Sequence, residues 1–323
     1  MSAQHESKGA IYAAFAANMG IAVSKFIAFS ITGASSLLAE AFHSVADSSN
    51  QILLLLGSRK SRQKPSRTHP FGYGRAHYLY AFIVSIVLFS LGGLFALYEG
   101  IHKIQNPATL ESPIVAYIVL IVAMFLEGFA LRTAMNEARS FKPKNQSWWQ
   151  FLRRTKSVNH VVLTMEDSAA LIGLCFAFTG VVLSSVTNNP IWDAIGTLMI
   201  GALLIVVACI LFVEVKSLLI GEAVDISTER KMRKIISSAS GVEHLVDLKT
   251  LYVGPVELFV AMKITVNAND SAKIVATTID EVEAKLRSEF PYAKLIYIEP
   301  DIFRSKSQQR SHDKLYSEKY KKA

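Results

Sequence analysis

The chain has 323 residues, of which 51% are hydrophobic and 19% are charged, and its formal net charge is +8 at pH 7. A soluble domain of this length carries more charge and no repeated long apolar runs, so the composition excludes an ordinary soluble protein. The basic residues lie in short blocks between apolar runs, which is typical of membrane-protein loops and not of a nucleic-acid-binding protein. We therefore expect an α-helical membrane protein with no nucleic-acid partner.

Six apolar runs are long enough to cross a bilayer as helices. The connection between the second and third runs and the one between the fourth and fifth are rich in Lys and Arg. The positive-inside rule therefore places these connections and both termini in the cytoplasm. The predicted transmembrane helices are Ala10–Thr32, Ser36–Gly57, Tyr78–Ile101, Pro113–Ala134, Val161–Ser184 and Pro190–Phe212.

A change in character after Ile220 indicates a small soluble domain. Its pattern predicts, in order, an amphipathic helix, two strands, a second helix and a third strand, which suits a two-layer α+β domain. The predicted elements are Thr228–Ala239, Val246–Val253, Leu258–Val266, Ser271–Phe290 and Ala293–Ile298. The predicted organisation is thus a cytoplasmic segment 1–9, a six-helix transport domain 10–219, a cytoplasmic domain 220–301 and a basic, disordered tail 302–323.

The second apolar run carries an unusual polar stripe. Glu40, His43, Asp47 and Asn50 are spaced three or four residues apart, so they lie on one face of a helix. One ionisable residue in the middle of a membrane costs about 2.5–3.5 kcal/mol, so these side chains need partners. Two interpretations remain: a polar seam that holds helices together, or half of a metal site, since imidazole and carboxylate together suit a cation.

The motifs and the order of elements together resemble the cation diffusion facilitator family of divalent-metal/proton antiporters. Within it, His43–Gln51, Leu126–Gly128 and Val161–Asp167 look closest to the zinc transporter 9-like branch. The resemblance implies six transmembrane helices, a cytoplasmic metallochaperone-like (ferredoxin-like) domain and a homodimer. The motifs that carry the family resemblance are Leu38–Asp47, Thr68–Arg75, Ile191–Gly196 and Leu295–Pro300.

The family resemblance also implies a ligand set. Members hold the ion on four ligands, two each from the second and fifth spans, at i, i+4 spacing. His43 and Asp47 match the pair on the second span, and Asp167 matches one position on the fifth. The other position on the fifth span is Leu163, which cannot bind a metal, so the usual tetrahedral set is one ligand short.

Glu166 and Glu127 are the two favoured candidates for the missing ligand. Glu166 is adjacent to Asp167 and so points about 100° round the helix, which would require that helix to be rotated or unwound. Glu127 is an intramembrane carboxylate from the fourth span, and it could equally form a structural pair with a basic or amide side chain. Weaker candidates are Thr164, His160 and Asn18.

The resemblance predicts a transporter that exports divalent cations, zinc first, from the cytoplasm in exchange for protons. Mn²⁺, Fe²⁺ or Co²⁺ is an alternative substrate, and a transporter-derived, non-transporting membrane regulator is an alternative function. No enzyme activity and no prosthetic group are expected, and no His-Glu-x-x-His metalloprotease motif is present. We expect a multi-pass protein of a bacterial plasma membrane, because the N-terminus carries no recognisable presequence.

Overall fold

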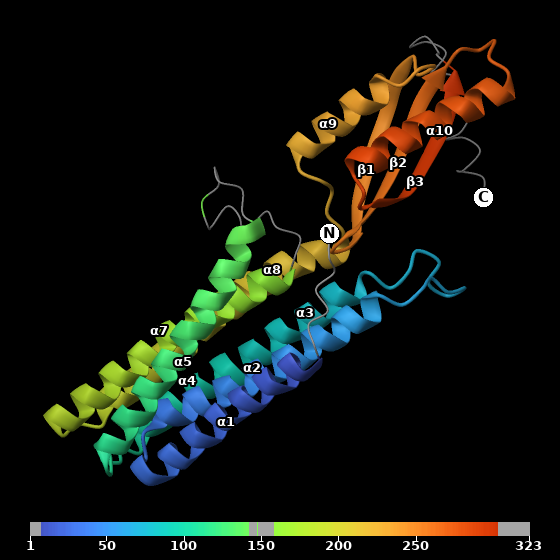
Figure 1. The fold of residues 1–323 in the computed structure, drawn as a ribbon. Coiled ribbons are helices and arrows are strands. Elements are labelled where there is room, and N and C mark those ends of the chain that lie inside the picture. Colours follow the sequence, from blue (N-terminus) through green and yellow to red (C-terminus); the bar gives the residue numbers. More distant parts are fainter. Residues whose placement is uncertain (1–7, 142–146, 148–157, 303–323) are drawn as a thin grey trace. The chain divides into compact units, whose positions relative to one another are not determined.

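The computed structural model describes residues 8–141, 147 and 158–302 (Figure 1). The predicted tail and much of the second basic connection lie outside the described residues. The chain divides into two compact units, Met1–Ile220 and Gly221–Ala323.

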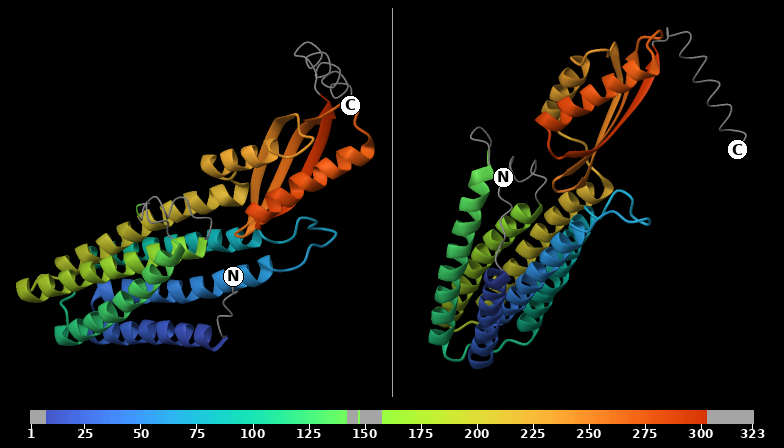
Figure 2. Two further views of the ribbon diagram at one scale, coloured as in Figure 1. Left: turned by 45° about the horizontal axis from the view of Figure 1, so that its top comes forward. Right: turned by 45° about the vertical axis from the view of Figure 1, so that its right-hand side comes forward.

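The first unit is a bundle of long helices that run side by side (Figures 1 and 2). The third apolar run is one continuous helical stretch in which a π-helical segment, η1, joins two α-helices. A π-helix is rare, and the sequence pattern gave no indication of it. The helices are α1 (Lys8–Thr32), α2 (Ser35–Ser61), α3 (Ala76–Val87), η1 (Leu88–Leu94), α4 (Phe95–Gln105), α5 (Pro113–Phe141), α7 (Val158–Thr187) and α8 (Ile191–Ile220).

Among the described residues, four helical stretches are long and apolar enough to cross a membrane, namely Ala76–Gln105, Pro113–Asn136, Val162–Thr187 and Ile191–Ile220. Helix α2 is long enough to cross a membrane, but its polar stripe and basic end lower its mean hydropathy. In α1, the stretch that qualifies as apolar is Asn18–Thr32, which is shorter than the other four. Six membrane spans therefore remain a prediction, although the described part of the bundle contains six long helical stretches.

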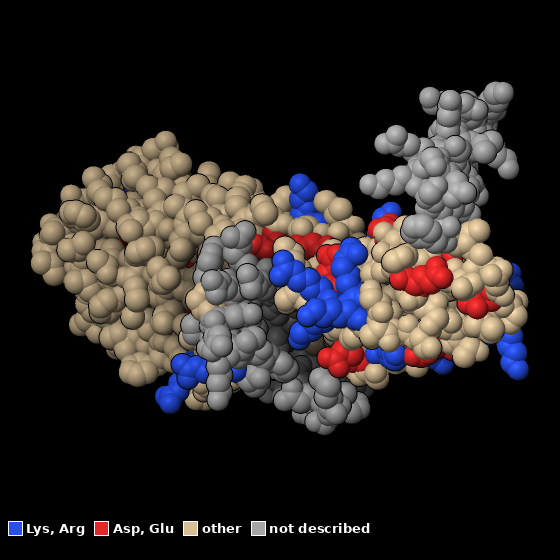
Figure 3. All heavy atoms as spheres, turned by 90° about the horizontal axis from the view of Figure 1, so that it is seen from above, with Lys and Arg blue, Asp and Glu red and all other residues tan. Residues whose placement is uncertain are grey.

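The outer surface of the bundle is apolar. On α5, the side chains of Ile114, Phe125 and Phe129 are 69%, 77% and 73% exposed. Figure 3 shows a broad part of the helical surface on which almost no charged atoms appear. Exposed apolar area of this extent is what a helix that faces lipid requires.

Helix α8 packs closely against its neighbours at glycine positions. A Cβ atom on Gly201 would lie 2.8 Å from the backbone nitrogen of Leu97, and one on Gly196 would lie 2.9 Å from the carbonyl oxygen of Phe176. Small residues of this kind allow helix backbones to approach closely in a membrane, where dispersion contacts hold helices together. Helix α8 is thereby fixed against both α4 and α7.

The turn between α1 and α2 is held by two buried charged side chains. Gly33 has φ +65°, a conformation that favours glycine, and its carbonyl oxygen accepts a 2.6 Å hydrogen bond from Lys103 Nζ of α4. The carboxylate of Asp193 on α8 accepts hydrogen bonds from the backbone N–H groups of Ser35 (2.8 Å) and Ser36 (3.3 Å), and from both hydroxyls. Asp193 therefore caps the N-terminus of α2 from another helix.

The second unit has the helix–strand–strand–helix–strand order that the sequence predicts. The sheet order is β1-β2-β3. Strand β1 is antiparallel to β2, and Thr250 pairs with Val260. Strand β2 is parallel to β3, and Ala261 pairs with Tyr297. Both helices cover one face of the sheet (Figure 1). The elements are α9 (Ile226–Ser237), β1 (His244–Gly254), β2 (Glu257–Val266), α10 (Ala272–Glu289) and β3 (Ala293–Ile302).

The core of the second unit lies between the helices and the sheet. Met232 and Ile236 of α9 and Val282 and Leu286 of α10 are fully buried there. Asp225 caps α9: burial would raise its pKa, but hydrogen bonds from Ser227 and Thr228 outweigh burial and lower the pKa to about 2. The predicted α+β fold is confirmed, with each element boundary within about four residues of the expected position.

We predict that Asp193→Ala destabilises the bundle. The substitution leaves the buried N–H groups and hydroxyls of Ser35 and Ser36 without their acceptor, at a cost of about 1–3 kcal/mol. The apparent unfolding temperature of the purified chain in detergent should fall. Asp193→Asn keeps one acceptor oxygen and should fall between Asp193→Ala and the wild type; equal unfolding temperatures for all three would contradict the capping role.

Candidate metal centre

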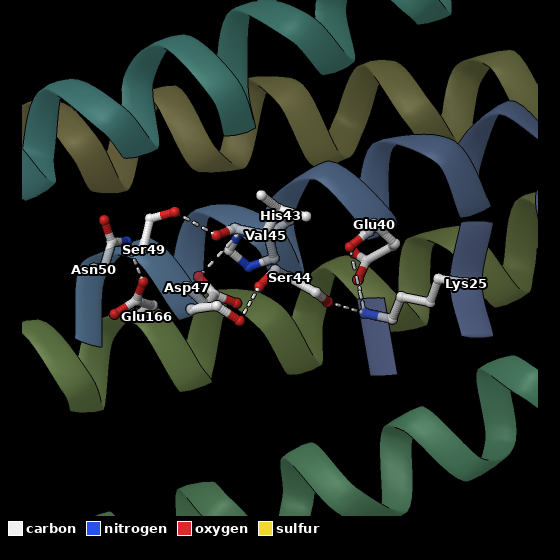
Figure 4. Close-up of polar contacts among 10 residues, drawn as sticks. Lys25, Glu40, His43, Ser44, Val45, Asp47, Ser49, Asn50 and Glu166 are labelled. Atoms are coloured by element: carbon white, nitrogen blue, oxygen red, sulfur yellow. Dashed lines mark hydrogen bonds and ion pairs between the residues drawn. The ribbon is translucent and has the colours of Figure 1, made fainter. Parts of the chain in front are cut away.

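The polar stripe of α2 faces the interior of the bundle (Figure 4). Glu40 and Asn50 are completely buried, and His43 is 1% exposed. The side chain of Asp47 is 14% exposed. Helix α7 lies across from this stripe and contributes Glu166, which is 4% exposed. The stripe therefore lies within the protein and does not contact lipid.

His43 and Asp47 are neighbours one helical turn apart. His43 Nδ1 lies 3.5 Å from Asp47 Oδ1. Neither ring nitrogen of His43, nor Asp47 Oδ1, has a hydrogen-bond partner within the part of the chain that the structure describes. A buried imidazole normally finds such a partner, so this pair has free capacity to bind a cation.

Glu166 connects α7 to the stripe. Its carboxylate accepts a 2.5 Å hydrogen bond from Asn50 Nδ2, and it lies within hydrogen-bonding reach of the Asp47 carboxyl group. Two carboxylates that face each other in an apolar interior repel unless a proton or a cation lies between them. At the contact between Asp47 and Glu166, a proton or a cation would relieve this repulsion.

The register of α7 differs from the family-based expectation. Helix α7 is α-helical throughout, and it presents Glu166 to α2 without being unwound. The neighbouring Asp167 is only half-buried. Within the described residues it forms no hydrogen bond or ion pair, although Glu166 and Glu127 are near enough to act on it electrostatically. Leu163, at the usual ligand position, is half-buried.

Glu127 approaches the stripe from a third helix. It is half-buried on α5, and together with Asn18, Ile21, Ser44 and Asp47 it lines a narrow pocket between α1, α2 and α5. Within the described residues, no three or more His, Cys, Asp or Glu side chains are close enough together to hold a metal ion. The candidate ligands His43, Asp47, Glu166, Asp167 and Glu127 would have to converge further to surround one, so their assignment stays a prediction.

The ion-pair partner of Glu40 was not predicted from the sequence. Lys25 of α1 is 1% exposed, and its ammonium group forms an ion pair with Glu40 Oε2 at 3.0 Å (Figure 4). The position of this lysine inside the first apolar run could have indicated the ion pair, because a buried ammonium group requires a negatively charged partner. Glu40 was recognised as part of the stripe, but its partner was not.

The loop after α2 contains hydroxyl groups and a single histidine, His69, at the positions considered as metal ligands. By the family resemblance, a second metal position of some members would fall in this loop, where only His69 matches a ligand, so we predict no metal site there. Here Ser66 and Tyr73 occupy the other two ligand positions, and their hydroxyls lie 3.1 Å apart, within hydrogen-bonding distance. His69 itself is exposed and stacks on Tyr73 with 4.4 Å between ring centroids.

Comparison with known proteins identifies the family. Residues 11–220 match the cation efflux transmembrane domain, and residues 225–301 match the cytoplasmic domain of cation efflux proteins. The chain therefore belongs to the cation efflux family, the cation diffusion facilitators that the motifs predicted. It is an integral membrane protein of a transporter family rather than an enzyme, and in this family a divalent cation is the transported substrate and not a prosthetic group.

The similar proteins include eukaryotic and bacterial transporters. The mouse "Proton-coupled zinc antiporter SLC30A9, mitochondrial" is 32% identical over 71% of this chain, and the match covers 41% of its own length. "Metal tolerance protein C4" of Arabidopsis thaliana is 30% identical over 68% of this chain and 48% of its own. The chain thus matches less than half the length of these relatives. "Cation-efflux pump FieF" of Serratia proteamaculans is 27% identical over 90% of this chain and 91% of its own.

We predict that cysteines placed at Asp47 and Glu166 form a disulfide more readily than cysteines at Asp47 and Asp167. The reason is that α7 directs residue 166, and not residue 167, toward α2. The background would carry Cys175→Ala and Cys209→Ala, which remove the two native thiols. After treatment with a membrane-permeant oxidant, maleimide labelling of the denatured chain counts the remaining thiols. Preferential cross-linking of the 47/167 pair would contradict the register of α7.

Proposed function

We propose that this protein exports divalent cations, zinc first, from the cytoplasm in exchange for protons by alternating access. The observation that carries the proposal is the cluster at the α2–α7 interface. There His43 and Asp47 lie 3.5 Å apart with free coordination capacity, and a second carboxylate, Glu166, faces Asp47. In the proposed cation-bound state, His43, Asp47 and Glu166 bind the ion, and Asp167 or Glu127 completes the set.

Exchange with protons follows from the chemistry of these ligands. Imidazole and carboxylate must be deprotonated to bind a metal, so a metal ion and protons compete for the same atoms. In the cation-free state a proton between Asp47 and Glu166 relieves their repulsion, and in the loaded state the cation does so. A site that opens alternately to the two sides of a membrane then couples outward cation flow to inward proton flow.

The identity of the cation rests on relatives and on donor type. Several similar proteins are named proton-coupled zinc antiporters. One imidazole with several carboxylates suits Zn²⁺, but oxygen-rich ligand sets also favour Mn²⁺, Fe²⁺ or Co²⁺, which are the alternative substrates. Zinc takes first place because of the relatives, and the ligands by themselves do not select it.

We further propose that the protein is a homodimer in a bacterial plasma membrane, with the basic connections and both termini in the cytoplasm. The match to bacterial efflux pumps over nine tenths of both chains supports that membrane, although other similar proteins are named as mitochondrial. The positive-inside rule supports the orientation. The family match of the cytoplasmic domain supports the dimer.

A second function is favoured by one observation. Leu163 occupies a position at which the family resemblance implies a ligand, so a chain that has lost transport and acts as a membrane regulator is the competing proposal. Measurement of flux separates the two, because a regulator moves no cation.

The predicted outcome is that purified protein in lipid vesicles moves Zn²⁺ when a pH gradient is imposed. Asp47→Ala should abolish this flux, because it removes both the contact with His43 and the contact with Glu166. Glu111→Gln, which alters an exposed carboxylate in the connection between α4 and α5, should transport like the wild type. The antiporter proposal fails if Asp47→Ala transports as well as the wild type, or if the wild type transports no cation at all.

A further inference from the structure

Lys25 is held as a metal ion would be held. Its ammonium group contacts three oxygen atoms: Glu40 Oε2 at 3.0 Å, Ser44 Oγ at 2.8 Å and the backbone carbonyl oxygen of Glu40 at 3.5 Å. Carboxylate, hydroxyl and carbonyl oxygens are also the donors that hard divalent cations prefer. The ammonium group therefore occupies a ready-made cation position inside the bundle (Figure 4).

Glu40 retains unused capacity in this arrangement. It is completely buried, and its second carboxylate oxygen, Oε1, has no hydrogen-bond partner in the described part of the chain. Across from it on α7 is Gly173, where a Cβ atom would lie only 2.8 Å from Glu40 Oε1. Helix α7 thus leaves room for the Glu40 carboxylate at the same interface where Glu166 meets Asn50.

The Lys25–Glu40 pair lies along the same seam as the candidate metal centre. Glu40 precedes His43 by one helical turn, about 4.5 Å along the axis of α2. The Lys25 ammonium group is also close enough to act electrostatically on His43, Asp47 and Glu127. A buried ion pair is weak evidence of added stability, since well-packed apolar residues often do as well. The position of the Lys25–Glu40 pair beside the proposed ligands His43 and Asp47 instead indicates that the pair interacts with the transported cation.

We propose that Glu40, with Ser44, forms a second cation position of the transport pathway, and that Lys25 is a tethered cation that a passing divalent ion displaces from it. This inference rests on the proposed transport function. In the resting protein the ammonium group neutralises Glu40. When a divalent ion leaves His43 along α2, it exchanges with the ammonium group at the oxygens of Glu40 and Ser44.

Counting bound Mn²⁺ on the purified full-length chain in detergent tests the proposal, because an oxygen-only site suits this ion and electron paramagnetic resonance separates free from bound Mn²⁺. Lys25→Met removes the tethered charge and should bind one more Mn²⁺ per chain than the wild type. The double variant Lys25→Met/Glu40→Gln should lose the additional ion. An unchanged number in Lys25→Met would overturn the proposal.

A matched control comes from Lys103, which is 6% exposed in the same bundle but bonds only the carbonyl oxygen of Gly33 among the described residues. Lys103→Met should not gain an ion, and a gain there equal to that of Lys25→Met would also overturn the proposal. Zn²⁺ binding by the wild type, lost in His43→Ala, reports separately on the proposed transport function. The two ideas can therefore fail independently.

A second variant covers the case in which Lys25→Met does not fold. Glu40→Gln leaves the Lys25 ammonium group without its carboxylate, so its charge acts undiminished on His43 and Asp47. Zn²⁺ affinity should then fall roughly tenfold or more, a coupling of ordinary size between neighbouring sites. Unchanged Zn²⁺ affinity in Glu40→Gln would overturn the proposal, because Glu40 and Lys25 would then not be connected to the transport ligands.

Discussion

A charged or strongly polar side chain in an apolar bundle must find a partner, and α2 carries several such side chains on one face. The arrangement of the neighbouring helices follows from this constraint. Helix α1 supplies Lys25 to Glu40, and α7 supplies Glu166 to Asn50. Between these two pairs lies His43, whose ring nitrogens have no such partner among the described residues. Two paired positions therefore enclose His43, the residue that we propose as a cation ligand.

Much of the fold could be predicted because its causes are local. Apolar runs of membrane-spanning length separated by basic segments define the bundle, and the alternation of strand residues defines the second unit. The π-helical segment was not predicted, and the number of membrane spans stays a prediction. The π-helical segment η1 changes the period of the third helix without changing its composition. The polar stripe of α2 marks its buried face, but the same polar residues lower its hydropathy, so composition alone does not establish how many helices cross a membrane.

The candidate site was predicted in part. Its members on α2 follow from spacing on one helix, since His43 and Asp47 share a face wherever that helix packs. The members on α7 depend on how far that helix is rotated about its axis. Glu166 and Asp167 differ by about 100° in direction, and only tertiary packing determines which of the two meets Asp47. Lys25 could not be connected to Glu40 from sequence, because the contact depends on the packing of α1 against α2.

The cap on α2 has a mechanical consequence. Asp193 anchors the first residues of α2 to α8, whereas the opposite end leads into a loop, so any tilt of the helix would have its pivot near Ser35. At 1.5 Å per residue, Glu40 lies about 7 Å and Asn50 about 22 Å from that pivot. A tilt of about 10° would therefore displace Glu40 by roughly 1 Å but Asn50 by roughly 4 Å. A small rotation about one fixed end could open the contact with α7 at Asn50 while Glu40 barely moves.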